Sequence, residues 1–407
     1  MAGGALQGVR VLDLSGEPGQ FCGKLMGDLG AEVIKVEPPE GDDVRRLGPF
    51  CDDVVDVNRS LYWHAMNTSK RAITLNLQTE TGQDLLRRLL PSTDIVLESF
   101  APGTLRRWGL DFATLHPQYP HLIVTSVTPF GQTGPYSAYR GTDLEVLALG
   151  GFLAICGDPD RPPLRVSLPQ SNLFASVSAF TGSLLAYYHR LRGGDGQHVD
   201  VSMQECATNL HYAQLSWHTY GIITPRLGST LWFGNYIPIT FGCQDGYVQA
   251  IPILSWATLL PWMIDHGMAG DLTTPAWQER LQTLATAWSQ QEVDHASEIV
   301  AAFLARFPKK VLYEEALQRR ILLYPVQTVP DCLADQQLQE RLYFVQVQSP
   351  ALDKPLLYPG APFRLSATPW QIHAPAPRLG EHNAAIYGQE LGLSAAAQQA
   401  LQQEGVL

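Results

Sequence analysis

The residue types that most often hold metals or act as bases are scattered along this sequence. No cysteine stands in a CxxC pair, and no histidine has a second histidine or a glutamate four residues away; the six cysteines are Cys22, Cys51, Cys156, Cys206, Cys243 and Cys332. Structural zinc sites and metal-dependent hydrolases depend on such spacings. We therefore expect no metal site, reduced and mostly buried thiols, and structural roles for the histidines.

Motifs for serine hydrolysis, zinc proteolysis and nucleotide binding are also missing, because the sequence holds no GxSxG, HExxH or Walker A pattern. The first predicted strand-to-helix turn, Gly16 to Gly19 followed by Gly23, is not the GxGxxG of dinucleotide-binding proteins. Glu37 does stand at the end of the next predicted strand, where such proteins bind a ribose. This partial match does not favour a nicotinamide cofactor.

Any site must be positioned by alternating strands and helices, which the apolar runs predict for the first half of the chain. Strand-like runs stand at 9–14, 31–37, 72–77, 94–100 and 121–127, with apolar-periodic segments between them. Thr79 is the expected N-cap of the helix that contains QDLLRRLL. One long helix is predicted from about 170 to 192, before Gly193-Gly194 and a further strand in QHVDVSM. This alternation predicts an α/β fold with a mostly parallel sheet.

The middle of the chain, residues 222–330, has a different pattern of predicted elements. A DG turn at 245–246 predicts a hairpin, and amphipathic helices follow from Trp256 to Arg320, which indicates a smaller α+β domain. The tail is expected to return to the first domain, and AAAQQALQQEGVL to form a surface helix. The predicted domains are therefore 1–221, 222–330 and 331–407.

Composition and charge narrow the class of protein. The 407 residues are 45% hydrophobic and 16% charged, which is typical of a soluble globular protein. A net charge of -11 argues against binding to nucleic acid, and no stretch reaches the roughly 18 apolar residues of a membrane span. The N-terminus has no signal-peptide pattern. We expect a cytoplasmic protein without nucleic-acid or membrane partners.

An ordered series of motifs resembles the class III CoA-transferases, the group that includes formyl-CoA:oxalate and carnitine CoA-transferases and the alpha-methylacyl-CoA racemases. The series covers nearly the whole chain: GVRVLDL, LGAEVIKVEPPEGDDVR, NTSKRAITLNL, VLESFAPGTLRRWGLD, GQTGPY, RGTDL, LRGGDGQHVDVSM, DGYVQ, GAPFRLS and PRLGEH. The resemblance implies a Rossmann-like large domain formed by both chain ends, a small middle domain, and a dimer of interlocked rings. It implies coenzyme A thioesters as substrates and no tightly bound cofactor.

The resemblance also implies residues that bind coenzyme A. Arg107 and Arg140 fall where family members place cationic contacts, and the guanidinium fork suits phosphate. Ser99 and Trp108 are expected to line the same groove, and Lys70 and Arg71 are further candidates. A solvated helix face would explain Arg107 as well. Asp143 matches an acidic position near the catalytic pocket, although capping of the next helix would account for it too.

The stretch VSLPQSN, at 166–172, carries the main departure from the family. Active transferases have an aspartate at the position of Asn172, which attacks the donor thioester to form a mixed anhydride and then an aspartyl-CoA thioester. An amide can neither ionise nor form that anhydride. The racemase pair is missing as well, because Thr142 and Asn172 stand where the histidine and aspartate belong. Gln20 in the first loop and LWFGNYIPI, in place of a glycine-rich loop, also depart from the family.

Three functions remain open on the sequence. The chain is interpreted first as the non-nucleophilic subunit of a heteromeric CoA-transferase, in which a paralogue supplies the aspartate. Family pairs of this kind act on arylsuccinates with succinyl-CoA as donor. The second hypothesis is an acyl-CoA enzyme with another mechanism (a lyase, hydrolase or dehydratase), in which Asn172 donates a hydrogen bond to the thioester carbonyl. The third is a non-catalytic acyl-CoA-binding homodimer.

Overall fold

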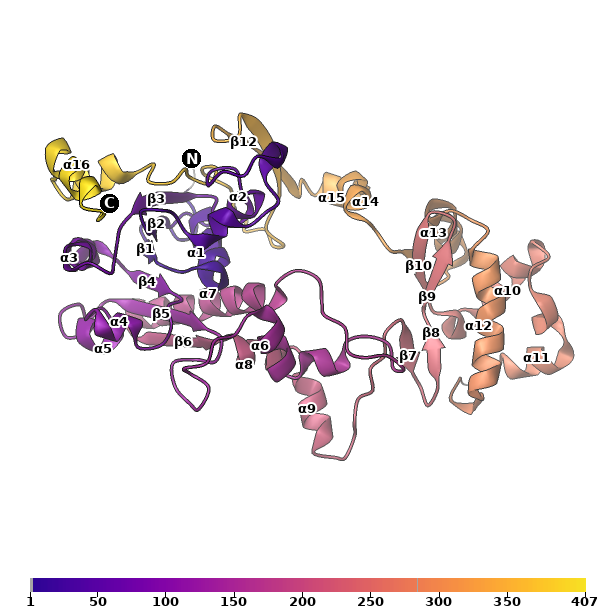
Figure 1. Ribbon diagram of the computed structural model, residues 1–407. Coiled ribbons are helices and arrows are strands. Elements are labelled where there is room, and N and C mark those ends of the chain that lie inside the picture. Colours follow the sequence, from indigo (N-terminus) through magenta and orange to yellow (C-terminus); the bar gives the residue numbers. More distant parts are fainter. Residues whose placement is uncertain (1–2, 284) are drawn as a thin grey trace. The chain divides into compact units, whose positions relative to one another are not determined.

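The computed structural model describes residues 3–283 and 285–407, which form two compact units (Figure 1). The larger unit combines residues up to Phe152 with Val166–Ser216 and Gln337–Leu407. The smaller unit combines Leu153–Arg165 with Trp217–Gln336. These boundaries lie a few residues from those suggested by the sequence, at 221/222 and 330/331. They also assign 153–165, which the sequence placed with the first domain, to the smaller unit.

A six-stranded parallel sheet forms the centre of the larger unit. Its strands lie in the order β3-β2-β1-β4-β5-β6, the order of doubly wound dinucleotide-binding folds, which changes direction between β1 and β4. Each strand overlaps a strand-like run of the sequence, although β3 is shifted toward the N-terminus of its predicted run at 72–77: β1 (Arg10–Asp13), β2 (Glu32–Glu37), β3 (Lys70–Thr74), β4 (Ile95–Glu98), β5 (Ile123–Thr128) and β6 (His198–Ser202). The predicted α/β fold class is confirmed.

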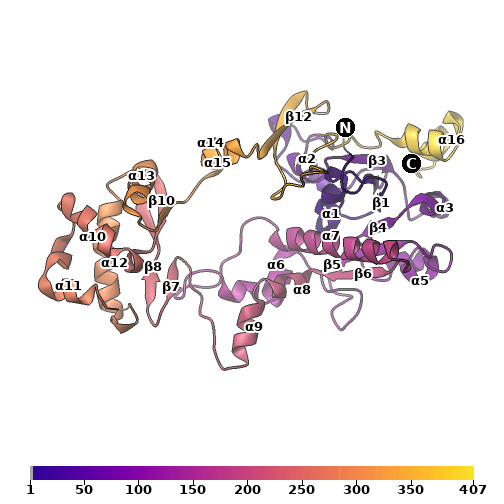
Figure 2. The same cartoon turned by 180° about the vertical axis from the view of Figure 1, so that it is seen from behind.

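Two helices, α1 (Glu17–Asp28) and α7 (Gln170–Leu191), pack against each other on one face of this sheet (Figure 2). The buried side of α7 is made of small residues at helical spacing, among them Ala175, Ala179 and Ser183. Small side chains let α7 approach the sheet closely, and the Ser183 hydroxyl lies 2.7 Å from that of Thr125 on β5. The long helix predicted for 170–192 is therefore present.

The opposite face of the sheet carries the main apolar core of the larger unit. Leu12, Ile34, Val96 and Val124 pack there with leucines of α3 (Glu80–Leu89) and with Leu407 at the chain end. Thr79 caps α3 as predicted, because its hydroxyl accepts a hydrogen bond from the Gly82 N–H at 3.0 Å. Shorter helices complete the unit: α2 (Leu61–Met66), α4 (Thr104–Arg107), α5 (Phe112–Leu115), α6 (Asp143–Leu149), α8 (Met203–Asn209) and α9 (Tyr212–His218).

The C-terminal segment returns to the larger unit. It contributes the antiparallel pair β12 (Phe344–Ser349) and β13 (Lys354–Pro359), a π-helix at Ala384–Glu390 and the helix α16 (Ala395–Gln403). The backbone N–H of Asn76 donates to the carbonyl of Val406 at 2.7 Å, and the Tyr387 hydroxyl donates to the carbonyl of Thr74 at 2.7 Å. These bonds attach the tail beside the end of β3.

The smaller unit has its own sheet and core. Three antiparallel strands, in the order β11-β10-β9, pack with helices around Trp262, Val300 and Phe303. The predicted hairpin is present, although Gln244 and Asp245 form its turn because Gly246 already pairs with Cys243. The elements of this unit are β7 (Thr230–Trp232), β8 (Tyr236–Pro238), β9 (Thr240–Cys243), β10 (Gly246–Ala250), α10 (Trp256–Asp265), α11 (Pro275–Arg280), α12 (Gln290–Leu304), α13 (Lys309–Arg319), β11 (Leu323–Pro325) and α14 (Val329–Ala334). The helix α15 (Gln336–Glu340) begins where the chain passes back to the larger unit.

A buried ion pair joins strands β1 and β3 from the side of α1. The Lys70 ammonium lies 2.7 Å from Asp13 Oδ2 and also donates to the Gln20 carbonyl at 2.8 Å and to Asn67 Oδ1 at 2.9 Å. Both charged side chains are fully buried. Burial opposes the charged form of Asp13, but the ammonium groups of Lys70 and Lys35 outweigh it and lower the pKa of this carboxyl.

We predict that Lys70→Met will lower the free energy of unfolding by about 3–5 kcal/mol, because it leaves the Asp13 carboxylate buried without its counter-charge. The double variant Asp13→Asn, Lys70→Met should recover much of that loss. Arg71→Met is the matched control: its side chain is 30% exposed and pairs with Glu32 at the surface, so its loss should stay within about 1 kcal/mol. Equal losses for Lys70→Met and Arg71→Met in chemical denaturation would contradict this account.

Candidate active site

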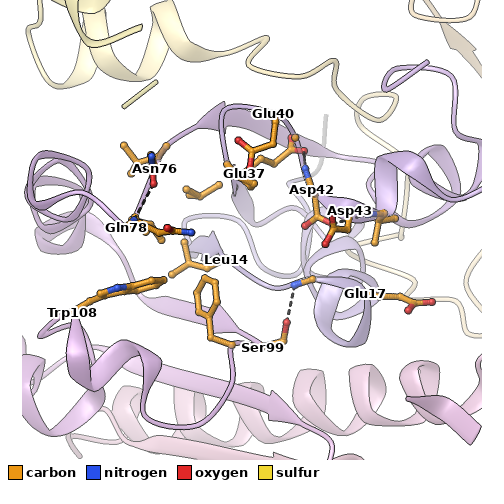
Figure 3. Close-up of a pocket in the computed structure, with 18 of the residues that line it drawn as sticks. Leu14, Glu17, Glu37, Glu40, Asp42, Asp43, Asn76, Gln78, Ser99 and Trp108 are labelled. Carbon is orange, nitrogen blue, oxygen red and sulfur yellow. Dashed lines mark hydrogen bonds between the residues drawn. The ribbon is translucent and has the colours of Figure 1, made fainter. Parts of the chain in front are cut away.

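A pocket of about 560 Å³ lies at the carboxyl ends of β1 to β4, where the strand order changes direction (Figure 3). Open α/β sheets bind their ligands at this place, because the loops that leave adjacent strands diverge there. The walls combine apolar side chains, including Leu14, Phe100 and Trp108, with polar ones, including Asn76, Gln78 and Ser99. Among the described residues, the pocket therefore provides both stacking and hydrogen-bonding surface.

The charged side chains that line this pocket are all acidic: Glu17, Glu37, Glu40, Asp42 and Asp43. Two of them are neutralised by buried cations. Arg45 grips Glu37 with two hydrogen bonds, of 2.6 and 2.8 Å, and Lys35 lies 3.0 Å from Asp42. Glu37 is consequently not free to bind a ribose, which removes the remaining resemblance to a nicotinamide site.

The loop between β1 and α1 is fixed from three sides. Asp13 Oδ1 accepts hydrogen bonds from the Ser15 N–H at 3.0 Å and from its hydroxyl at 2.5 Å. The Gly16 N–H donates to the Ser99 hydroxyl at 2.7 Å, which joins the ends of β1 and β4 (Figure 3). Glu17 Oε1 accepts a hydrogen bond from the Tyr62 hydroxyl at 3.0 Å. Burial and the Glu17 carboxylate raise the pKa of Tyr62, so this phenol keeps its proton.

Asn172 lies in the first turn of α7, next to this loop. One turn further along the same helix face, the Ser176 hydroxyl donates to the Pro18 carbonyl at 2.7 Å, so this face of α7 meets the start of α1. The Asn172 side chain is 5% exposed, and its amide makes no hydrogen bond to any residue that the structure describes. The loop before it contains Leu168 at a φ of 65°, an unfavourable conformation for a branched side chain.

Asp143 holds the N-terminus of α7 in place. Its Oδ1 accepts two hydrogen bonds of 2.8 Å, from the backbone N–H and from the hydroxyl of Ser171. The helix that begins at Asp143 is instead capped by Thr142, with Glu145 completing a capping box. The other oxygen, Asp143 Oδ2, is buried and has no hydrogen-bond partner among the described residues. One buried oxygen therefore remains available beside Asn172.

The structure divides the predicted coenzyme A contacts into two groups. Ser99 and Trp108 line the pocket. Arg107 and Arg140 do not: both side chains are exposed, Arg107 on α4 beside Trp108, and Arg140 in the segment that leads into α6. The only hydrogen bond of the Arg107 guanidinium to a described residue goes to the Thr104 hydroxyl, at 3.0 Å. Its remaining donors can reach a ligand.

Lys70 and Arg71, the further candidates for binding coenzyme A, do not line the pocket. All three donors of the Lys70 ammonium are used inside the protein, by Asp13, Gln20 and Asn67. Arg71, on the outermost strand of the sheet, pairs with Glu32 at 2.6 Å and with Glu390 at 3.3 Å, away from the pocket. Alternation along β3 sends the two side chains to opposite faces of the sheet, and neither lines the pocket.

Sequence reasoning missed Glu17 and Tyr62. Glu17 could have been found from its position, because it follows the first predicted strand and begins a helix. In open α/β sheets, residues at such a position line the pocket where the strand order changes direction. Tyr62 gave no such signal, because only the fold brings it to Glu17 across 45 positions of the chain.

We predict that Asp143→Ala will lower the free energy of unfolding by about 1–3 kcal/mol, since it removes the acceptor of both Ser171 hydrogen bonds. Ser171→Ala is the matched control: it deletes only the hydroxyl donor and keeps the backbone N–H bond, so its loss should be smaller. Chemical denaturation of the two variants gives the comparison. A larger loss for Ser171→Ala would show that Asp143 does not hold this helix end.

Comparison with known proteins agrees with this geometry. Residues 6–383 match the family model for CoA-transferase family III. The fold is similar to the crystal structure of a CAIB/BAIF family protein from Brucella suis, with a TM-score of 0.81 and 30% identity over 96% of this chain and 100% of that one.

Characterised relatives match along nearly their whole length. The chain is 33% identical to the BbsE subunit of succinyl-CoA:(R)-benzylsuccinate CoA-transferase from Thauera aromatica, over 93% of this chain and 92% of that protein. It is 35% identical to the succinyl-CoA–D-citramalate CoA-transferase of Chloroflexus aurantiacus, over 96% and 94%. With a family model that spans most of its length and relatives of this similarity, the chain belongs to CoA-transferase family III.

Proposed function

We propose that this chain is the non-nucleophilic subunit of a heteromeric CoA-transferase, which moves coenzyme A from a donor such as succinyl-CoA to a carboxylic acid. The observation that carries the proposal is Asn172, a buried amide at the start of α7. The resemblance of the sequence to the family places it where active members have their aspartate. Similarity to BbsE, a protein named as a subunit, supports the heteromer. A paralogous chain would supply the reacting carboxylate.

The chemistry of the amide explains this division of labour. A carboxylate in the first helical turn is ionised at neutral pH and is stabilised further, by about 0.3–1 kcal/mol, by the positive end of the helix. It can attack a thioester and leave again. The amide nitrogen of Asn172 has its lone pair delocalised into the carbonyl, and the neutral oxygen is a poor nucleophile. Asn172 keeps the shape of the site without its reactivity.

The pocket suits the uncharged parts of coenzyme A better than its phosphates. Its apolar and amide side chains can hold a ring or a pantetheine chain, whereas its acidic lining repels the phosphate groups. The phosphates would then lie outside the pocket, against the exposed guanidinium groups of Arg107 and Arg140. Ser99 and Trp108, in the lining, would contact the nucleoside or pantetheine portion.

A second candidate is an acyl-CoA enzyme that works by another mechanism. It is favoured by the free hydrogen-bonding capacity of Asn172, whose amide makes no bond to the described residues. An N–H donor aimed at a thioester carbonyl stabilises the negative charge that develops on that oxygen. In this case the chain alone would consume an acyl-CoA, for example by hydrolysis, without transferring coenzyme A to an acid.

The two candidates are separated by the activity of the purified chain alone. The subunit proposal predicts no exchange of coenzyme A between succinyl-CoA and any carboxylic acid, and no enzyme-bound thioester that hydroxylamine can trap. Exchange should appear when an aspartate-bearing paralogue is added, and the two chains should co-purify. Acyl-CoA turnover by this chain without an acceptor would favour the second candidate instead.

The Asn172→Asp variant provides the control for that experiment. It restores the missing carboxylate and should permit trapping of an acyl or thioester adduct, although the altered loop at Gln20 will keep its rate below that of an active transferase. If the wild-type chain alone transfers coenzyme A at a usual enzyme rate, about 1–10³ per second, the subunit proposal is wrong.

Coenzyme A binding provides an independent prediction. The double variant Arg107→Ala, Arg140→Ala should weaken the affinity for coenzyme A at least tenfold, because about 1.4 kcal/mol of charge-assisted hydrogen bonding corresponds to a factor of ten. Lys310→Ala, Arg341→Ala removes the same charge from other exposed positions and should leave the affinity nearly unchanged. Calorimetry measures both variants. Equal affinities would exclude these arginines as phosphate contacts.

A further inference from the structure

A row of polar side chains crosses the sheet of the larger unit away from the candidate active site. Glu98, Ser126 and Asp200 are in register on the neighbouring strands β4, β5 and β6. They lie on the face opposite α7, because the adjacent Thr125 is the residue that contacts α7. Leu14 directly follows β1, donates its backbone N–H to the Leu97 carbonyl of β4, and belongs to the apolar main core. The face therefore changes from apolar to polar at Glu98.

Two members of this polar row, Glu98 and Ser126, are buried, whereas Asp200 is exposed and accepts a hydrogen bond from the Gln132 N–H at 3.0 Å. Glu98 is 3% exposed and Ser126 is 2% exposed. Glu98 Oε2 accepts a hydrogen bond from the Phe100 N–H at 2.7 Å, and the Ser126 hydroxyl lies 2.9 Å from His198 Nε2. Burial raises the pKa of Glu98 to about 7, and the Asp200 carboxylate adds to the effect. A carboxyl with so perturbed a pKa in a cleft indicates a functional site.

These side chains open into a second pocket of about 530 Å³. Leu105, Phe112 and Ala113 contribute apolar wall, and the polar lining consists of Glu98, Arg106, Asp111, Ser126, Gln132, Thr133 and His198. The Phe112 ring stacks on His198, with the ring centroids 6.0 Å apart. The second pocket shares no lining residue with the first. It is therefore a separate place for a ligand with an apolar body and one polar end.

The charged side chains that line this pocket are Glu98, Asp111 and Arg106. Arg106 is 78% exposed and pairs with Asp111 at 3.4 Å, which leaves Glu98 as the buried charged group without a cationic partner among the described residues. The exposed Asp200, next in register to Ser126, adds negative charge beside the pocket, so the pocket favours a cation. Burial lowers the pKa of His198, so its imidazole is neutral at pH 7. The net charge of -11 adds a field that attracts cations. A metal ion is not favoured, because no three His, Cys, Asp or Glu side chains among the described residues are grouped to hold one.

We propose that this second pocket binds a small organic cation, a primary ammonium compound with an apolar body, whose ammonium group is held by Glu98 and Ser126. The ammonium donates to the Glu98 carboxylate and the Ser126 hydroxyl, and the apolar body packs against Leu105 and Phe112. A hydrolytic role for Ser126 and His198 fits less well. Ser126 lies within a strand and shares its hydroxyl with Glu98, whereas a nucleophilic serine needs an exposed oxygen.

The test compares two probes of similar shape and opposite charge, 2-phenylethylammonium and 3-phenylpropionate, by calorimetry on the full chain. The ammonium compound should bind and the carboxylate should not. Glu98→Gln keeps the size of the side chain and should weaken ammonium binding at least tenfold. Glu404→Gln, which removes an exposed carboxylate near the chain end, should leave it unchanged.

Two further measurements keep the proposal testable if Glu98→Gln folds poorly. Ala113→Trp places a large ring on the exposed rim of the pocket and should block the ammonium compound without disturbing the core. In the wild type, affinity should rise between pH 6 and 8 as Glu98 ionises, since the carboxylate is the form that attracts the cation, and Glu98→Gln should abolish this rise. Equal binding of both probes, no ammonium binding at millimolar concentration, or unchanged binding in Ala113→Trp would overturn the proposal.

Discussion

The carboxylate of Asp13 is the point on which the geometry of the candidate active site depends. One of its oxygens holds the buried Lys70 ammonium, and the other holds the start of the loop after β1 through Ser15. That loop carries Gly16, which bonds to Ser99, and Pro18, which accepts the Ser176 hydroxyl of α7. A charge buried this deeply must keep its partners, because an unpaired one costs several kcal/mol. These bonds therefore fix the position of the loop. Because Gly16 and Glu17 of this loop line the pocket, they also fix the shape of that wall.

Next to this loop, the start of α7 combines a strained backbone with a buried oxygen that has no described partner. Leu168 has a left-handed backbone, and Asp143 keeps one buried oxygen without a partner among the described residues. Asn172, in the same turn, is 5% exposed. Proteins tolerate such features where a ligand completes the hydrogen bonds. The chain thus has the fold of CoA-transferase family III, and under the proposed function Asn172 is the point at which the family chemistry is lost.

Neighbouring residues at the end of β4 line two different pockets. Glu98 points into the second pocket, and the next two residues, Ser99 and Phe100, line the first. Successive side chains of a strand alternate between faces, and the turn after β4 redirects those that follow. Carboxylates occur in both lining sets, but their settings differ. Glu37 and Asp42 are neutralised by Arg45 and Lys35. Glu98 instead has the Phe100 N–H and the Ser126 hydroxyl as its described partners.

The sequence by itself determined the class of the fold, the positions of the six strands, the long helix α7 and the unusual amide at Asn172. These features are local: apolar runs, caps and one residue type decide them. Only the tertiary structure decided that Lys70 is a structural counter-ion, that Asp143 holds Ser171, and that Glu37 is taken by Arg45. A cation in a loop motif looks the same in sequence whether its donors face a phosphate or a buried carboxylate. Which of the two it binds depends on how deeply the cation is buried and on partners that are tens of residues away in the sequence. No local sequence pattern determines these.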